Sequence, residues 1–152
     1  MPIDKIVVHW TTASLDSTLA TFQSPVAGVS AHYVIDRDGL LYQCVDLDDT
    51  AYHAGDFGVN LRSVGIEHVG GPQYDSFTEE QYATTSSLCA DISVANNFPL
   101  DELHVQGHRE IVPTQCPGVL DIPRIVGGVM TDAQMAELKS FIEAQTNVAV
   151  QA

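Results

Sequence analysis

Lys5-Ile6-Val7-Val8-His9-Trp10 is the stretch that decides the fold, because it is short, almost wholly apolar and rich in β-branched residues. Such a segment is typical of a strand that is buried on both faces at the centre of a sheet. His9 stands near its end, and a buried imidazole needs partners for its ring nitrogens. The stretch therefore predicts a central strand that carries a polar side chain with a specific role.

The rest of the chain alternates between strand and helix patterns. The predicted elements are a helix capped by Ser14, a hairpin of 31–35 and 40–45, a loop over 46–60, a strand over 63–69, a helix capped by Thr78, and a strand over 103–106. Strands interleaved with helices predict an α/β domain with a central mixed β-sheet flanked by helices. We expect this domain to occupy residues 1–126.

The C-terminal part has a different pattern. Gly127-Gly128 resembles a hinge, and Thr131 to Gln134 form a capping box that opens a second helix. The apolar stripe of this helix consists of Met135, Leu138, Phe141 and Ile142. Residues 127–152 are thus predicted to form a hinge and a C-terminal amphipathic helix, which either packs on the domain or mediates docking or self-association.

The composition narrows the class of partner. Hydrophobic residues make up 45% of the 152 residues and charged ones 17%, which is typical of one globular domain. The net charge of −14 argues against nucleic acid, because phosphate binding needs clustered Lys and Arg. No apolar run approaches the ~20 residues that cross a bilayer, so we expect no membrane partner. The start, MPIDKIVVHW, lacks a secretory signal, and we expect synthesis in the cytoplasm.

Three cysteines, with no CxxC pair among them, make a poor disulfide framework. Cys44 and Cys89 are interpreted as small buried apolar residues. Cys116 is different, because it follows His108 within one loop. Together with His9 and His108, Cys116 makes a set of two imidazoles and one thiolate. Three such protein ligands leave the fourth position of a zinc ion open, which is the arrangement of catalytic zinc sites. Spacing alone is a weak signal for this site, since an isolated strand histidine is usually structural.

Five blocks of the sequence occur together in one order. They are Ile6-Val7-Val8-His9, Ser30 to Ile35 with Asp38-Gly39, Ala51-Tyr52-His53-Ala54-Gly55, Ser63-Val64-Gly65-Ile66-Glu67, and Gly107-His108-Arg109-Glu110 leading to Cys116-Pro117-Gly118. With these blocks the chain, over roughly residues 4 to 126, resembles the zinc amidase family of phage lysozyme-type N-acetylmuramoyl-L-alanine amidases and peptidoglycan recognition proteins. The resemblance implies a sheet flanked by helices with one zinc ion (Zn²⁺) at a groove.

Carried over to this chain, the resemblance implies that His9, His108 and Cys116 bind zinc. Many relatives have Asp where Cys116 stands, and thiolate is the softer, more electron-donating ligand. Glu67, on the predicted strand 63–69, matches the catalytic acid/base of small bacterial amidases, which would take a proton from water and return it to the leaving amine. The alternative for Glu67 is a solvated strand residue.

Two positions depart from the phage-type pattern. Ala31 stands where those members have Tyr, and Thr114 stands where many members have Lys. Peptidoglycan recognition amidases have Thr there, so we expect the Thr114 hydroxyl to stabilise the developing oxyanion. If Thr114 is only a turn residue, zinc supplies most of that stabilisation.

The resemblance also assigns roles around the metal. His53 and Trp10 are expected to contact substrate in the groove. His32 is expected to lie behind the ligands and to orient a ligand or a loop. His68 and His104 alternate away from the site and are interpreted as surface or packing histidines.

The implied reaction is hydrolysis of the amide between N-acetylmuramic acid and L-alanine in peptidoglycan. Wall polymers are anionic, as this chain is, so we expect recognition through a shaped groove. An endolysin of a phage or prophage, acting on the cell wall after release, fits a chain without a signal peptide; a cytosolic wall-recycling amidase is the alternative. Two further classes stay open: a non-catalytic peptidoglycan-binding module, and a thiol hydrolase with Cys116 as nucleophile and His108 as base.

Overall fold

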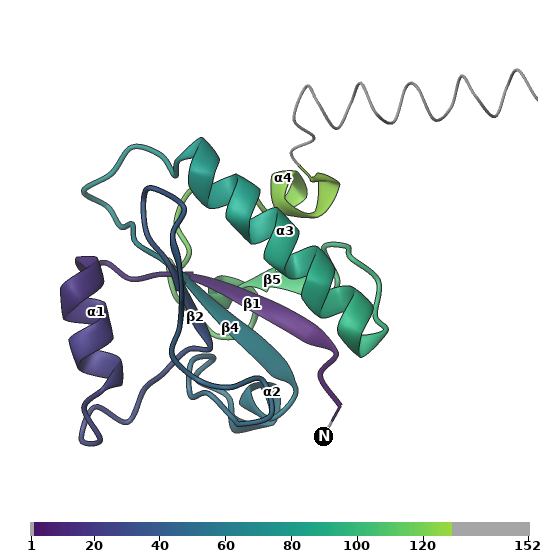
Figure 1. The fold of residues 1–152 in the computed structure, drawn as a ribbon, viewed down its shortest axis with the longest axis horizontal. Helices are drawn as coiled ribbons and strands as arrows, with labels where there is room; N and C mark the ends of the chain where they lie inside the picture. Colours follow the sequence, from purple (N-terminus) through teal and green to yellow (C-terminus); the bar gives the residue numbers. More distant parts are fainter. Residues whose placement is uncertain (1, 129–152) are drawn as a thin grey trace, which may run out of the picture.

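Five strands form one sheet in this computed structural model, which describes residues 2–128 (Figure 1). The strands are β1 (Lys5–Trp10), β2 (Tyr33–Ile35), β3 (Leu41–Gln43), β4 (Ser63–His68) and β5 (Val105–Gly107). Their order is β3-β2-β4-β1-β5, and every neighbouring pair is parallel except β2 and β3. The predicted mixed sheet is therefore confirmed.

The stretch Lys5–Trp10 is an inner strand, as its sequence predicts. β1 lies between β4 and β5, and Ile6, Val7 and Val8 are fully buried. A strand with partners on both sides and packing on both faces must be apolar almost throughout. Each such fully buried side chain contributes about 1.5–3 kcal/mol of hydrophobic stabilisation.

Helices flank this sheet. They are α1 (Leu15–Phe22), α2 (Phe57–Asn60), α3 (Glu79–Asn96) and α4 (Ile122–Gly127), with a 3₁₀ turn η1 (His108–Glu110). The predicted caps at Ser14 and Thr78 are confirmed. The Ser14 side chain accepts a hydrogen bond from the Ser17 N–H, and the Thr78 hydroxyl accepts one from Gln81, whose side chain accepts from the Thr78 N–H in return. Each cap satisfies backbone donors that the first helical turn leaves unpaired.

The main core lies between the sheet and α3. Buried side chains of alternate strand positions, such as Ile6 and Val8 of β1, join Tyr82, Cys89 and Ile92 of α3 in one apolar cluster. The opposite face of β1 and β4 is turned toward α2 and the loop before it. The hydroxyl of Ser63, on this face of β4, donates a hydrogen bond to the carbonyl of Val59 in α2. Alternation along the strands thus separates an apolar face from a polar one.

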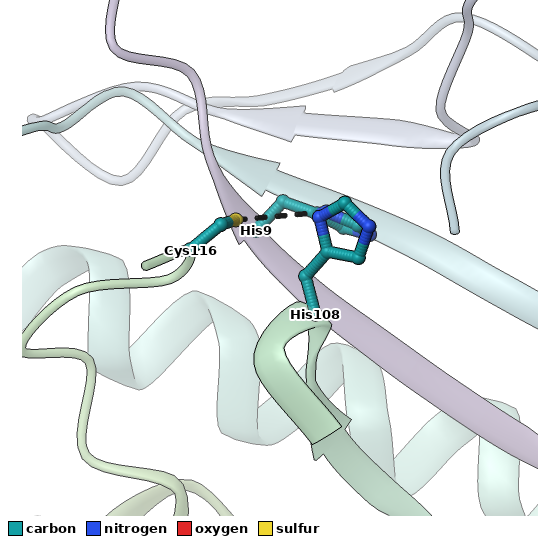
Figure 2. A group of neighbouring side chains, drawn as sticks. All are labelled: His9, His108 and Cys116. Atoms are coloured by element: carbon teal, nitrogen blue, oxygen red, sulfur yellow. Dashed lines mark hydrogen bonds between the residues drawn. The ribbon is translucent and has the colours of Figure 1, made fainter. Parts of the chain in front are cut away.

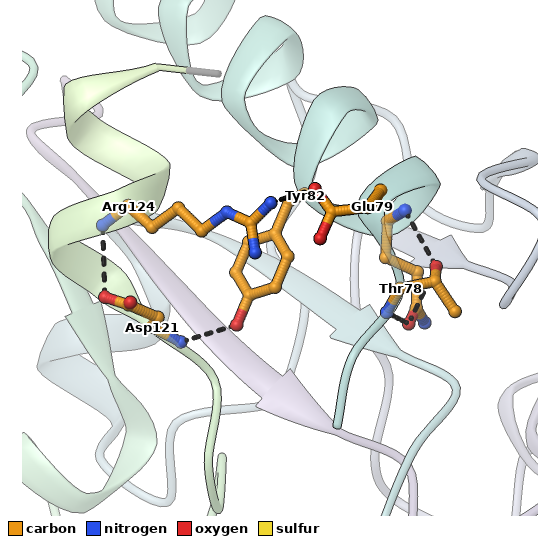
Figure 3. A network of polar contacts seen from close by, with 6 residues as sticks. Thr78, Glu79, Tyr82, Asp121 and Arg124 are labelled. Atoms are coloured by element: carbon orange, nitrogen blue, oxygen red, sulfur yellow. Dashed lines mark hydrogen bonds and ion pairs between the residues drawn. The ribbon is translucent and has the colours of Figure 1, made fainter. Parts of the chain in front are cut away.

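A polar network fastens α4 to α3 (Figure 3). The guanidinium of Arg124 lies 4.1 Å from the centroid of the Tyr82 ring and pairs with Glu79. The Asp121 N–H donates to the Tyr82 hydroxyl over 3.0 Å, and the Asp121 side chain caps α4 by accepting from the Arg124 N–H. The segment after Cys116, which includes α4, is therefore held against α3.

The structure differs from the sequence prediction in several places. Residues 57–60, predicted as loop, form α2, because the Asp56 side chain caps it by accepting from the Val59 N–H. α4 was not predicted; it ends on Gly127, where the hinge was expected, and Gly128 has a φ of +69°. The predicted helix from residue 131 lies outside the described residues. Its packing or self-association stays a prediction.

The cysteines divide into two environments. Cys89 is buried in the α3 core, as predicted, and Cys116 is buried as well. Cys44 is exposed, so the expectation of a buried residue was wrong. The reason is topological, since Cys44 follows β3, which is an edge strand with no partner beyond it among residues 2–128.

Among residues 2–128, no helix has both the length and the apolar character that crossing a membrane requires.

Candidate active site

The strands bring the predicted site residues to one edge of the sheet. His9 lies near the end of β1, Glu67 near the end of β4, and His108 directly follows β5. These three strands are parallel, and the carboxyl ends of parallel strands meet at one edge, which is the usual place for a ligand site. His9 and Glu67 are direct partners in the register of β1 and β4, so both side chains project from the same face.

His9, His108 and Cys116 form a compact cluster (Figure 2). One ligand atom from each residue lies within 4.8 Å of the others. The Cys116 Sγ is 3.7 Å from the His9 Nδ1, and the rings of His9 and His108 have centroids 4.5 Å apart. The sequence prediction that these three residues come together is confirmed.

The chemistry of this cluster fits a zinc ion. Burial, assisted by the neighbouring histidines, lowers the pKa of His9 well below its usual value, and burial also lowers the pKa of His108. Both imidazoles are therefore neutral and can donate a lone pair. Burial raises the pKa of Cys116 to about 12, while the Trp10 N–H, 3.4 Å from its Sγ, favours the thiolate. A metal that displaces the thiol proton would satisfy this buried sulfur.

The loop between His108 and Cys116 is closed by its own hydrogen bonds. The Arg109 N–H donates to the Cys116 carbonyl over 2.9 Å, and a cis peptide bond joins Cys116 to Pro117. Gly118 has a φ of +65°, and a β-carbon there would overlap the Trp10 ring. Only glycine fits both constraints, so this loop holds Cys116 against β1.

Glu67 lines the same pocket as His9, His108 and Cys116 and has an unusual environment. Burial raises its pKa to about 8. Within residues 2–128 its Oε2 is buried and has no hydrogen-bond partner. A buried carboxyl oxygen without a partner is costly, which is typical of a group kept for chemistry rather than for stability.

A pocket of about 320 Å³ opens onto this cluster. It is lined by His9, Trp10, Thr11, Ala13, Thr18, Thr21, Phe22, Val29, Ser30, Tyr52, His53, Glu67, His108 and Cys116. The pocket thus joins the three metal-site residues to Glu67 and to both predicted substrate contacts, Trp10 and His53. Those contact roles stay predictions.

Thr114 is placed differently. Its hydroxyl oxygen accepts a hydrogen bond from the Cys116 N–H over 3.2 Å, and the residue is exposed. The pocket lining, as far as residues 2–128 define it, does not include Thr114. Its catalytic role stays a prediction, and its visible contact stabilises the turn that carries Cys116.

Two further histidines support the framework. The His32 Nδ1 accepts from the Gly65 N–H over 3.0 Å, and its Nε2 lies 3.2 Å from the Asp49 carbonyl, so the ring joins β4 to a loop. His68 is fully buried; its Nδ1 lies 2.9 Å from the His9 carbonyl and its Nε2 2.7 Å from the Thr85 hydroxyl. His68 is therefore a packing residue that also fixes the backbone of His9.

Sequence reasoning missed two residues next to the site. Ser63 Oγ lies 3.2 Å from the His53 Nε2, and the Asn60 side chain accepts from the backbone N–H groups of His53 and Ala54. Asn60 was part of a predicted loop, and Ser63 opens the block that contains Glu67 but was assigned no role. The signals that could have found them were their closeness in sequence to the His53 block and, for Ser63, its place in the Glu67 block.

Comparison with known proteins agrees with this geometry. Residues 1–119 match the family described as N-acetylmuramoyl-L-alanine amidase. N-acetylmuramoyl-L-alanine amidase A of Achromobacter lyticus is 33% identical over 91 residues, which are 56% of this chain. The matched part is 50% of that relative, so the chain matches only half of its length.

Solved structures have the same fold. The N-acetylmuramoyl-L-alanine amidase LysC from Clostridium intestinale URNW superposes with a TM-score of 0.71 at 21% identity, over 84% of this chain and 85% of LysC. The amidase AmiD from E. coli, in complex with the substrate anhydro-N-acetylmuramic acid-L-Ala-D-gamma-Glu-L-Lys, has a TM-score of 0.70 at 25% identity, over 87% of this chain and 60% of AmiD. The family match spans most of the chain, and this protein therefore belongs to the N-acetylmuramoyl-L-alanine amidase family.

Proposed function

We propose that this protein is a zinc-dependent hydrolase that cuts the amide between the lactyl group of N-acetylmuramic acid and L-alanine in peptidoglycan. The observation that carries the proposal is the position of Glu67, whose buried Oε2 has no hydrogen-bond partner among residues 2–128 and which lines the same pocket as His9, His108 and Cys116. Family membership and the substrate named for AmiD support this choice of bond.

His9, His108 and Cys116, which all line the pocket, would hold the metal. Zinc at such a site supplies a Lewis acid that polarises a carbonyl group and lowers the pKa of water to about 7.

Glu67 would handle the proton. In its ionised form the carboxylate takes a proton from the attacking water, and the resulting acid gives that proton to the nitrogen of the departing L-alanine. A raised pKa suits this double role, because the group must be able to hold the proton at neutral pH between the two transfers.

The alternative of a thiol hydrolase is less compatible with the site. Reactive thiols have a lowered pKa, whereas burial raises that of Cys116 to about 12. The Nε2 of His108 lies 3.1 Å from the Ala54 carbonyl and is engaged there, so only the Nδ1 of that ring could act as base. A non-catalytic binding module would have no use for Glu67 in this environment.

We also propose an endolysin-type role. Two of the similar structures are described as endolysins, one from Clostridium intestinale URNW and one a mutant from Bacillus subtilis. The substrate would then be the intact wall, with recognition through the pocket rather than through charge, since the chain carries a net charge of −14.

Digestion of purified peptidoglycan, with and without a chelator, tests the proposal. The expected products are stem peptides with a free N-terminal L-alanine, identified by mass analysis, and the chelator should abolish their release. The Cys116→Ala variant should lose both zinc and activity, whereas Cys89→Ala, at the other buried cysteine, should keep them. Products cut between sugars or inside the stem peptide would contradict the proposal, and activity that survives the chelator would favour the thiol mechanism.

A further inference from the structure

One short segment contacts both histidines of the candidate metal site. The Nδ1 of His53 lies 3.1 Å from the Nε2 of His9, and the backbone carbonyl of Ala54 lies 3.1 Å from the Nε2 of His108. Both contacts involve the ring nitrogen of the ligand that would face away from the metal. The segment His53–Ala54 therefore lies behind both imidazoles at once.

The contact with Ala54 determines the protonation of His108. A carbonyl oxygen can only accept a hydrogen bond, so the Nε2 of a neutral His108 must carry the proton. The Nδ1 of the same ring is then unprotonated and has its lone pair free. A neutral imidazole in this tautomer can bind a metal through Nδ1.

The tautomer of His9 follows from a longer chain of hydrogen bonds. The Ser63 hydroxyl lies 2.7 Å from the Val59 carbonyl and must donate to it, which leaves its oxygen to accept from the His53 Nε2 at 3.2 Å. With its proton on Nε2, His53 has an unprotonated Nδ1 that can only accept, so the His9 Nε2 donates to it. The unprotonated atom of His9 is thus Nδ1, the nitrogen 3.7 Å from the Cys116 Sγ.

The segment is itself held in place from two sides. The Asn60 side chain oxygen accepts from the N–H groups of His53 and Ala54 over 3.1 and 2.8 Å, and Asn60 is buried at the end of α2. On the sheet side, a β-carbon at Gly65 would lie 2.5 Å from the His53 Cγ, so the imidazole packs directly on the backbone of β4. Neither residue of the segment can shift without breaking one of these contacts.

We propose that His53, Asn60 and Ser63 are positioning residues that preset the tautomers of both histidine ligands, so that His9 and His108 each present an unprotonated Nδ1 to the metal. This inference rests on the proposed zinc site. It also changes the role expected for His53, because both of its ring nitrogens are engaged inside the protein. The ring nitrogens of His53 are therefore not free to bind substrate.

Zinc affinity, measured by competition with a coloured chelator, provides the main test. Loss of a partner behind a metal ligand typically weakens metal binding by about 10–100-fold, and we expect losses of this size for His53→Ala and Asn60→Ala. Matched controls are His104→Ala, a histidine paired with Asp101, and Asn96→Ala, whose side chain donates to the Ile92 carbonyl of its own helix. Both controls should bind zinc as the wild type does.

A conservative variant separates positioning from simple packing. In His53→Asn the side chain keeps an acceptor near the place of Nδ1, so it should recover part of the affinity that His53→Ala loses. Ser63→Ala removes the acceptor of the His53 Nε2 proton and should weaken zinc binding, whereas Ser93→Ala, at a serine bonded within α3, should not. Cobalt substitution adds a spectroscopic measure, because its visible absorption reports the geometry of the ligands.

Nitrogen chemical shifts of the imidazoles report directly which ring nitrogen carries the proton. In the metal-free wild type, His9, His53 and His108 should each carry the proton on Nε2. In His53→Ala the signal of His9 should change and that of His108 should not, because Ala54 still holds the latter.

The outcomes distinguish this inference from the proposed function. A wild type that binds no zinc would contradict the proposed function. Tight zinc binding by the wild type, with unchanged affinity in both His53→Ala and Asn60→Ala, would overturn this inference alone. A proton on the Nδ1 of His9 or His108 in the metal-free wild type would also overturn it, even if the variants fail to fold.

Discussion

The two faces of the sheet have opposite chemistry, and β4 shows the contrast within four residues. Val64 and Ile66 are fully buried in the core beneath α3, whereas Gly65 seats the His53 ring and Glu67 lines the pocket on the other face. Because side chains alternate along a strand, neighbouring residues belong to different environments. The same strand can therefore stabilise the fold with one set of residues and position the site with the other.

β1 follows the same rule. Ile6 and Val8 join the core, and His9, one position later, turns to the polar face. His68 is the exception, since it is a polar residue on the core side. It is tolerated there because both ring nitrogens have hydrogen-bond partners, the His9 carbonyl and the Thr85 hydroxyl. The two faces are thus coupled at His9.

The largest effect on activity should come from a substitution at Glu67, on the polar face of the sheet. Glu67→Gln keeps the shape of the side chain but removes its ability to take a proton, so the rate of amide hydrolysis should fall by about 10²–10⁴-fold. Zinc content should be unchanged, because Glu67 is not one of the three clustered residues proposed to hold the metal. Release of L-alanine-terminated peptides and metal analysis check both points. An active Glu67→Gln variant would remove Glu67 from the mechanism.

A substitution at the neighbouring residue, Ile66, should lower stability and leave the hydrolysis rate unchanged. Ile66→Ala removes a fully buried side chain from the core and should lower the free energy of unfolding by about 2–5 kcal/mol. Under conditions where it is folded, its hydrolysis rate should stay close to that of the wild type. Urea unfolding with parallel activity assays measures both. The contrast between the two faces would fail if Ile66→Ala lost activity while its stability stayed unchanged.

The raised pKa of Glu67 predicts a pH dependence of stability in the metal-free protein. Its pKa is about 8 in the folded state against about 4.5 in the unfolded chain, so between these values the folded state holds a proton that the unfolded state has lost. The contribution of Glu67 is fully present below pH 4.5 and is lost as the pH rises through 8. Relative to Glu67→Gln, the wild type should lose at most about 1.4 kcal/mol per pH unit in this window.

Denaturant unfolding of both proteins at several pH values, with a chelator present, measures this difference. The same comparison with zinc bound should show a smaller slope, because a nearby dication favours the ionised carboxylate. A difference between wild type and Glu67→Gln that does not change with pH would show that Glu67 is solvated rather than buried.

Local sequence signals predicted much of the fold. The apolar run of β1 and the caps at Ser14 and Thr78 depend only on neighbouring residues, and the structure confirms each of them. α2 could not be predicted in the same way. Its four residues, Phe57–Asn60, include a glycine and have no helical periodicity, and its cap Asp56 stands in a stretch that is typical of loops.

The cluster of candidate metal ligands was predictable, but the residues that support it were not. His9, His108 and Cys116 could be grouped because family blocks carry them, and the structure places them together. The contact between His9 and His53 joins residues 44 positions apart and depends on how a loop crosses β4. No local pattern encodes which ring nitrogen faces which partner, so the roles of Asn60 and Ser63 emerge only from the folded chain.

The smallest effect is expected at Thr114, which tests whether the catalytic residues extend from the polar face of the sheet to the loop that carries Cys116. Its hydroxyl accepts from the Cys116 N–H and lies in an exposed turn, so Thr114→Ala should lower the free energy of unfolding by about 0.5–1.5 kcal/mol through loss of one hydrogen bond. If this contact is its main role, hydrolysis should fall less than tenfold and zinc affinity only slightly. Removal of a true oxyanion donor typically costs about 10²–10³ in kcat. A loss of that size in Thr114→Ala, with stability and zinc content unchanged, would instead assign the oxyanion to this hydroxyl and would mean that the loop moves toward the pocket when substrate binds.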